Sequence, residues 1–209
     1  MDCQIRNRRL RLLISKLNKE RKTQANKLDI LCNDIILAQK DFIDKFDTVS
    51  FAAQFYKSIL GKNNLNSLLY EASKLIKDEI GDANISFFLS GHGNFQMHIF
   101  ESSLGGISES HNLEDCFTAE LVGEVCESNK LCTLADLLSI GLQCNPSMLN
   151  DITGFTIPLG EISKALGFVL IYRSIKNQLD YKRLSGIFAI VPGLSRAIEL
   201  CKPKVQTTD

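Results

Sequence analysis

Seven cysteines and three histidines are the side chains of this 209-residue chain that could do nucleophilic, redox or metal chemistry. The cysteines show no CxxC spacing, and no two potential metal ligands stand at the close spacing that a zinc site uses. The sequence therefore predicts no metal site and requires no cofactor, although a small molecule such as a nucleotide stays open as a ligand. Without a secretion signal, the cysteines are expected to be reduced and mostly buried thiols.

Other signals of catalysis or membrane insertion are absent from the sequence. It has no Walker loop and no GxSxG motif, and its histidines are too scarce for a convincing triad. No apolar segment follows the basic N-terminus, and no apolar run reaches the 18 residues of a membrane span. We therefore expect a cytoplasmic protein that is not an enzyme.

The elements that must position any site begin with an uninterrupted N-terminal segment. Residues 4–60 contain no Gly or Pro and carry a heptad-like apolar stripe. As one helix they would extend about 85 Å, and the stripe would need a partner, most simply a second copy of the chain. Several shorter helices of an all-α unit are the alternative. The predicted dimer interface consists of apolar residues at the a and d positions of the heptads: Leu10, Ile14, Leu17, Leu28, Leu31, Ile35, Phe42 and Val49.

Charged residues are unevenly distributed along this segment. Residues 1–27 hold nine basic and two acidic residues, a net charge of +7 in a chain that is neutral overall. The polar pair Arg21 and Gln24 marks the join to a more broadly apolar half. A basic helix can meet DNA, an anionic membrane or an acidic partner, but no interleaved aromatic residue or DNA-reading motif accompanies it. We expect a protein partner at the coiled coil and keep nucleic-acid binding as the alternative.

The remaining residues predict a mixture of helices and strands. Asn64 can cap, and Gly81 can end, a helix whose apolar residues recur with a 3.6-residue period. Strands are expected at 84–89, 95–101, 131–134, 154–159 and 165–172, and helices at 113–128 and 180–201. Residues 136–152 are expected to form a long connection, in which a helical turn stays open. The predicted organisation is a basic coiled-coil helix at 1–47, an α+β domain at 48–202 and a polar tail at 203–209.

Four stretches of the chain resemble the GAF domain, a cytosolic sensory module. They are Asn64–Leu89, Leu121–Asp136, Thr156–Leu170 and the apolar final helix Leu184–Leu200. The resemblance implies an α+β fold in which a long N-terminal helix, forming a coiled coil, precedes a GAF-like central antiparallel sheet flanked by helices. It also implies dimerisation through the first and last helices, which form a parallel bundle, and a pocket on the opposite sheet face under the loops 102–112 and 136–152.

The function that this resemblance implies is that of a homodimeric sensory or regulatory protein. It would sense a small molecule or bind a protein partner, and transmit the signal through its coiled coil. Expected pocket-lining residues are Phe88, His98, Phe100, Cys116 and Thr156. A ligand-free scaffold, whose pocket is filled by its own side chains, is the first alternative.

A redox protein is the second alternative. Cys116, Cys126 and Cys144 fall beside the expected pocket, in the region where the free methionine-(R)-sulfoxide reductases, which are catalytic GAF proteins, also carry cysteines. The Gly-rich context of the family's middle cysteine is missing after Cys126, and the chain has no Trp. A cysteine-based redox sensor or a reductase-like enzyme therefore stays an alternative to the sensory protein.

Overall fold

The computed structural model describes residues 2–81, 83–91, 94–101, 112–161, 164–176 and 181–202. The chain divides into two compact units, Met1–Phe46 and Asp47–Asp209. Helix α1 (Asp2–Ile59) runs without interruption from the first unit into the second, which confirms one long helix over the predicted segment. Most of the loop expected at 102–112, as well as His92, His111 and the tail 203–209, lies outside the described residues.

The apolar stripe of α1 is exposed in the single chain. The eight residues of the predicted dimer interface are between 50% and 69% exposed. Burying a leucine or isoleucine side chain contributes about 1.5–3 kcal/mol. Burial of this stripe against a partner would therefore contribute a large favourable free energy of association. An exposed apolar surface of this kind is typical of an interaction site.

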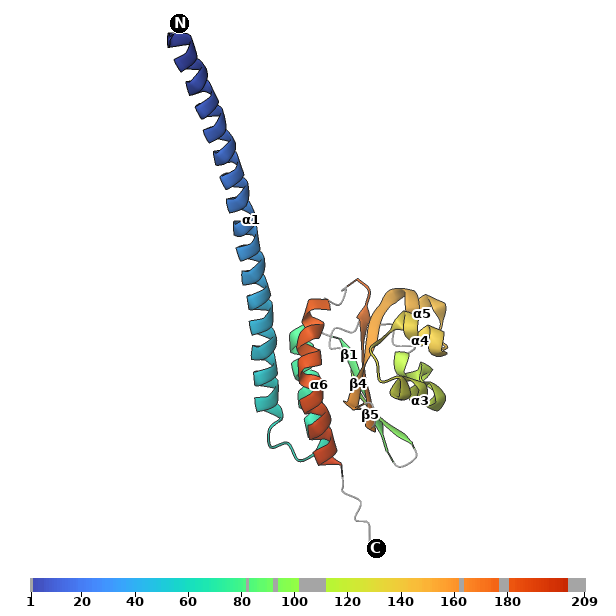
Figure 1. Ribbon diagram of the computed structural model, residues 1–209. Helices are drawn as coiled ribbons and strands as arrows, with labels where there is room; N and C mark the ends of the chain where they lie inside the picture. The colour runs from blue at the N-terminus through green and yellow to red at the C-terminus, as the bar shows by residue number, and fades with distance from the viewer. Residues whose placement is uncertain are drawn as a thin grey trace. The chain divides into compact units, whose positions relative to one another are not determined.

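The second unit is built on a sheet to which β1, β4 and β5 belong (Figure 1). The sheet has five strands in the order β2-β1-β5-β4-β3, and every neighbouring pair is antiparallel. This confirms the expected antiparallel sheet. Its strands are β1 (Asn84–Ser90), β2 (Phe95–Phe100), β3 (Cys132–Thr133), β4 (Ile152–Glu161) and β5 (Lys164–Ser174). Strands β1 and β5 are buried along nearly their whole length because both faces of the sheet are covered.

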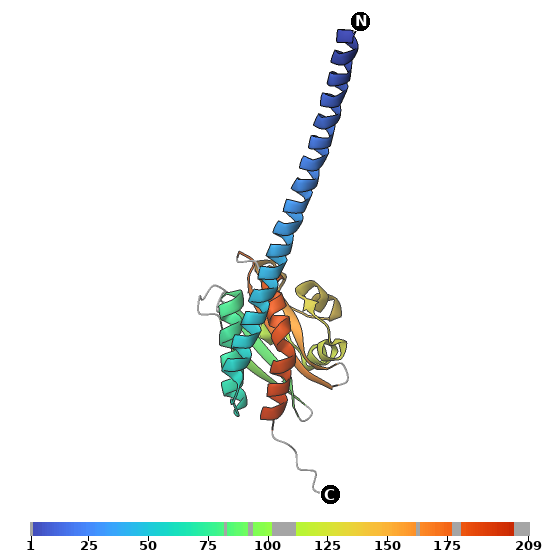
Figure 2. The same ribbon diagram turned by 60° about the vertical axis from the view of Figure 1, so that its left-hand side comes forward.

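Three helical segments cover the first face: α2 (Leu65–Ile80), α6 (Tyr181–Cys201) and the last part of α1, residues 47–59 (Figure 2). The predicted capping of α2 is confirmed, since the Asn64 side chain accepts a hydrogen bond from the Ser67 N–H at 3.2 Å. Tyr56 OH donates to the Ala189 carbonyl at 2.8 Å and joins α1 to α6. These helices and the sheet enclose one apolar core.

Helix α6 is long and apolar enough, between Arg183 and Cys201, to meet the length and composition of a membrane span. The sequence had predicted no such segment. In the structure this helix buries five apolar residues in the core on the first sheet face: Leu184, Ile187, Ile190, Leu194 and Ile198. These buried residues account for part of its hydropathy.

Shorter helices cover the second face: η1 (Leu113–Cys116), α3 (Ala119–Ser128), α4 (Leu134–Ile140) and α5 (Pro146–Asp151). The prediction of one helix over 113–128 is wrong, because the Thr118 hydroxyl accepts a hydrogen bond from the Leu121 N–H and starts a new helix there. The connection expected at 136–152 holds more than the one helical turn left open, since it contains most of α4 and all of α5. The first begins in a capping box between Thr133 and Asp136, which also ends the predicted strand early.

Glycine is required where β5 passes β1. Gly167 has a φ of +138°, and a Cβ there would lie 1.8 Å from the Phe88 carbonyl oxygen. We expect Gly167→Ala to lower the free energy of unfolding by more than about 3 kcal/mol, measured by urea denaturation. Gly123→Ala is the control: nothing lies within 4 Å of its added Cβ in α3, so it should stabilise the protein by up to about 1 kcal/mol. Equal effects of the two substitutions would contradict this description of the sheet.

Candidate functional site

The second sheet face, together with its covering helices, carries most of the polar and thiol groups that could do chemistry. Residues of four neighbouring strands, β1, β5, β4 and β3, point to this face. Leu170 of β5 pairs with Ser86 of β1 on one side and with Thr156 of β4 on the other. Thr156 in turn pairs with Cys132 of β3. This row crosses the sheet, and we call the face that it occupies, with the residues above it, the sheet-face site.

A carboxylate is buried in the sheet-face site. Glu114 of η1 is 2% exposed. Its Oε1 accepts a hydrogen bond from the Ser86 hydroxyl, and its Oε2 accepts one from Tyr172 OH at 2.6 Å. A carboxylate transferred out of water is costly unless hydrogen bonds replace its hydration. Two hydroxyl donors from neighbouring strands therefore hold η1 against the sheet.

Tyr172 remains a donor at all ordinary pH values. Burial, first, and then the adjacent Glu114 raise the pKa of the Tyr172 phenol far above its usual value. Its side chain reaches this face because Tyr172 lies two residues along β5 from Leu170. The phenol, the carboxylate and the Ser86 hydroxyl form one buried network, in which loss of any member leaves the others unsatisfied.

Three aromatic rings pack on the same face. Phe88 and Phe168 are direct partners across β1 and β5, and their ring centroids lie 4.7 Å apart in a stacked arrangement. Phe117, which follows η1, contacts both rings, with centroid distances of 5.0 Å to Phe88 and 5.8 Å to Phe168. The cluster supplies flat apolar surfaces close to the polar network.

One hydroxyl of the site has no hydrogen-bond partner in the described part of the chain. Thr156 is fully buried, and its Oγ1 finds neither a donor nor an acceptor there. An unsatisfied buried hydroxyl costs about 1–3 kcal/mol. Such a group is a natural anchor for a molecule that enters the site.

A disulfide joins two of the segments that cover the second sheet face. Cys116 of η1 is bonded to Cys144, between α4 and α5, with a Cα–Cα distance of 5.7 Å. This distance is in the usual range for a disulfide. The expectation of reduced thiols is wrong for these two residues: they are 28 positions apart in the sequence, but the fold brings their segments together over the sheet. Two of the three redox candidates are therefore paired.

The third redox candidate remains a free thiol. Cys126 of α3 is buried in the same cluster, and burial raises its pKa to about 11. The thiolate is the nucleophilic form of cysteine, so Cys126 is poorly prepared for nucleophilic attack near neutral pH. Cys132 is also buried, and its Sγ donates to the Lys130 carbonyl at 3.6 Å.

Two of the five expected pocket residues lie on the other sheet face. In the β1–β2 register Phe87 pairs with His98 and Ile85 pairs with Phe100, so these β2 side chains face the helices of the first face. Phe100 packs against the Phe87 ring at 5.8 Å. The His98 Nε2 is buried without a partner among the described residues, and burial lowers its pKa. The structure thus groups Phe88, Cys116 and Thr156 and separates His98 and Phe100 from them.

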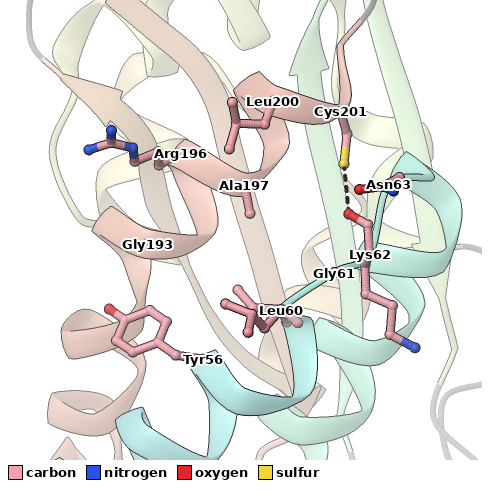
Figure 3. A pocket seen from close by; sticks show the side chains of 11 residues that line it. Tyr56, Leu60, Gly61, Lys62, Asn63, Gly193, Arg196, Ala197, Leu200 and Cys201 are labelled. Atoms are coloured by element: carbon pink, nitrogen blue, oxygen red, sulfur yellow. Dashed lines mark hydrogen bonds between the residues drawn. The ribbon is translucent and has the colours of Figure 1, made fainter.

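A separate apolar groove lies between the end of α1 and the last turns of α6, with a volume of about 530 Å³ (Figure 3). Gly193 and Tyr56 both line it, and the Tyr56 ring packs so closely on Gly193 that a Cβ there would lie 2.1 Å from Tyr56 Cε1. Cys201 Sγ donates to the Lys62 carbonyl at 3.4 Å and closes one end of the groove. Its lining is mostly apolar and contains none of the predicted site residues.

Sequence reasoning missed Glu114, Ser86 and Tyr172, the residues that form the polar centre of the site. A usable signal existed: Ser86 interrupts the apolar run of its strand, and Tyr172 ends the apolar run of the other. Buried polar side chains need hydrogen-bond partners inside the protein. Ser86 and Tyr172 together therefore indicated that a polar residue from the segments covering the second sheet face contacts them.

Comparison with known proteins gives the fold. No family model and no curated protein matches the chain. Among solved structures, the GAF domain of a phosphoenolpyruvate-protein phosphotransferase from Coxiella burnetii is 15% identical with a TM-score of 0.52, covering 74% of this chain and 94% of that one. A putative GAF sensor protein from Burkholderia vietnamiensis is 12% identical with a TM-score of 0.51, covering 77% and 99%.

An enzyme is also among the similar structures. The fRMsr protein of Staphylococcus aureus, in complex with its substrate, is 14% identical with a TM-score of 0.52, covering 72% of this chain and 95% of that one. At these identities the likeness establishes the fold and leaves activity open. The chain has the GAF fold.

The buried carboxylate network can be tested by substitution. Glu114→Gln keeps the shape of the side chain but replaces one acceptor oxygen with an NH₂ donor that faces a hydroxyl. We expect it to lower the free energy of unfolding by about 1–3 kcal/mol. The matched control is Asp115→Asn at the neighbouring exposed acid, which should change it by less than about 0.5 kcal/mol. Urea denaturation at neutral pH measures both; a silent Glu114→Gln would show that the network contributes nothing.

Proposed function

We propose that this chain is a homodimeric, non-enzymatic sensory or regulatory protein of the GAF type that acts in the cytoplasm. An input at the sheet-face site, either a small molecule or a protein partner, is passed on through α1. The observation that carries the proposal is the unsatisfied hydroxyl of Thr156 on a covered sheet face that also holds the Glu114 network. The likeness to GAF domains supports the proposal, because such domains often carry a pocket on the sheet face opposite their first and last helices.

The chemistry of the site favours a flat, polar-edged molecule. The rings of Phe88, Phe117 and Phe168 offer stacking surfaces. Glu114 has acceptor capacity beyond the two hydroxyl donors, and Thr156 can both donate and accept. An aromatic or purine-like ligand with exocyclic donors matches these groups.

The output side of the proposal is the exposed stripe of α1. A second copy of the chain would cover apolar residues of this stripe such as Leu10, Leu17 and Leu28, which are exposed in the single chain. A ligand changes a protein's conformational equilibrium only as far as it binds one state better than the other. The proposal therefore requires that binding at the sheet-face site alter the stability of the dimer formed by α1.

The ligand-free scaffold is the competing proposal for the same site. The close stacking of Phe88 on Phe168 supports it, since these rings already occupy part of the sheet face. In that case the domain is an interaction module, and its protein partner binds through the coiled coil.

A thermal-shift screen with purines, cyclic nucleotides and haem tests the ligand. We expect at least one compound to raise the Tm of the full chain, and Thr156→Val to abolish that shift. Valine has the shape of threonine without the hydroxyl, so the variant itself should be as stable as the parent or up to about 2 kcal/mol more stable. A flat response to every compound by purified ligand-free protein would remove the ligand hypothesis and favour the scaffold.

A thiol–disulfide switch is a second candidate function, and the Cys116–Cys144 bond favours it. A cellular dithiol would attack one sulfur, break the S–S bond through a mixed disulfide, and leave two thiols here while itself becoming oxidised. Reduction would free the segment after α4 from η1, which stays attached to the sheet through Glu114. The elevated pKa of Cys126 argues against turnover that needs a third, nucleophilic cysteine.

Reduction can be followed without assuming a ligand. We expect dithiothreitol to add 2 Da to the chain and to increase hydrogen exchange in residues 142–145, with smaller changes in 113–117. Cys144→Ser should mimic the reduced protein, whereas Cys126→Ala should retain the response. The switch is excluded if exchange in both segments is the same before and after complete reduction.

A further inference from the structure

The first unit of the chain has opposite charges at its two ends. Its basic part, residues 1–27, carries +7, whereas residues 28–46 hold four acidic and two basic residues, a net charge of −2. Helix α1 contains residues 2–46 of this unit, and residues 4–46 are exposed. If this unit pairs with a second copy, as the proposed function requires, the direction of pairing decides which charges meet.

Two copies that run in the same direction bring like charges together. In a parallel pair each a or d residue packs against its own equivalent, so Arg21 would meet Arg21 and Gln24 would meet Gln24 in the core of the pair. The flanking g and e positions would place Arg6 beside Arg11 of the second copy. No g–e pair between residues 6 and 46 brings opposite charges together in this arrangement.

Two copies that run in opposite directions avoid these contacts between like charges in one register. When Leu17 of one copy packs beside Leu28 of the other, the adjoining a–d layers pair Ile14 with Leu31 and Leu10 with Ile35. All three layers are apolar, and the two-fold symmetry of the pair repeats each of them. The layer at the end, Asn7 with Ala38, also avoids a charge.

The same register makes the polar break of the stripe self-complementary. Arg21 of each copy shares a layer with Gln24 of the other, so a guanidinium donor meets an amide oxygen. A polar layer at a single place in an apolar seam is a known device for fixing register. A shift of the helices by one heptad would separate Arg21 from Gln24 and pair each of them with an apolar residue of the other copy.

The charges at the flanking g positions also favour the antiparallel register. At the g positions, Arg6 comes beside Asp41 of the second copy, and Glu20 comes beside Lys27. Both are pairs of opposite charge, and symmetry doubles them. Exposed pairs contribute little stability individually, but complementary charges select between arrangements of otherwise similar burial.

We propose that residues 7–38 of two copies form an antiparallel coiled coil in which Leu17 lies beside Leu28 of the other copy. This inference rests on the proposed homodimer and adds its direction and register. The apolar layers supply the association, while Arg21, Gln24 and the flanking charges specify the arrangement.

Cross-linking at Cys32 tests the direction, because this cysteine is free and exposed on α1. It occupies an e position, which the antiparallel register places beside Arg11 of the second copy and a parallel pair places beside Lys27. In full-length protein with Cys3→Ser and Cys201→Ser, a short bis-maleimide should yield covalent dimer with Arg11→Cys and none with Lys27→Cys. Covalent dimer from Lys27→Cys alone, or from neither variant in a dimeric sample, overturns the inference.

Substitution of Gln24 gives an independent test with opposite signs. Gln24→Glu places a carboxylate beside Arg21 of the second copy in the antiparallel pair, and should tighten dimerisation about tenfold. In a parallel pair the introduced carboxylate would face its own equivalent in the second copy and weaken dimerisation instead. Gln24→Lys is the control and should weaken the antiparallel dimer about tenfold. Sedimentation equilibrium measures the parent and both variants; weaker association with Gln24→Glu overturns the inference.

The same measurements separate this inference from the proposed function. A dimer that forms in the parallel direction contradicts the antiparallel register and leaves the homodimer intact. Parent protein that stays monomeric at high concentration contradicts both, and the failure then lies in the proposed homodimer.

Discussion

The structure of the second unit depends on one constraint: its sheet is covered by helices on both faces. Strands β1 and β5 therefore need apolar side chains in both directions, and any polar side chain in them must find a partner inside the protein. Ser86 and Tyr172 break the apolar pattern, and Glu114 from the cover satisfies both. The polar centre of the candidate site is thus a direct result of covering the second face.

Much of the fold could be predicted because local signals were strong. Asn64 caps a helix whose apolar period is clear, and the apolar runs in β1 and β5 allow few alternatives. The segment after Leu113 was harder, because a hydroxyl cap at Thr118 outweighs the helical propensity around it. No composition signal separates a continuous helix from two helices that meet at such a cap.

The site was predicted only in part, for a physical reason. Which face a strand residue occupies depends on register, and a shift of one residue inverts it. The register of β2 on β1, in which Phe88 pairs with Met97, means that His98 faces away from Phe88. The pairing of Cys116 with Cys144 is a long-range contact between covering segments, and nothing in their spacing indicates it.

Tyr172 gives the sheet-face site an optical property. The chain has four tyrosines and no tryptophan, so no indole emission masks the phenols. A phenol that donates to a carboxylate in an apolar interior absorbs and emits differently from one in water, and Tyr172 is fixed in that arrangement by Glu114. The intrinsic fluorescence of the unmodified protein therefore carries a contribution from the centre of the site, and any molecule or movement that breaks this hydrogen bond changes it without a label.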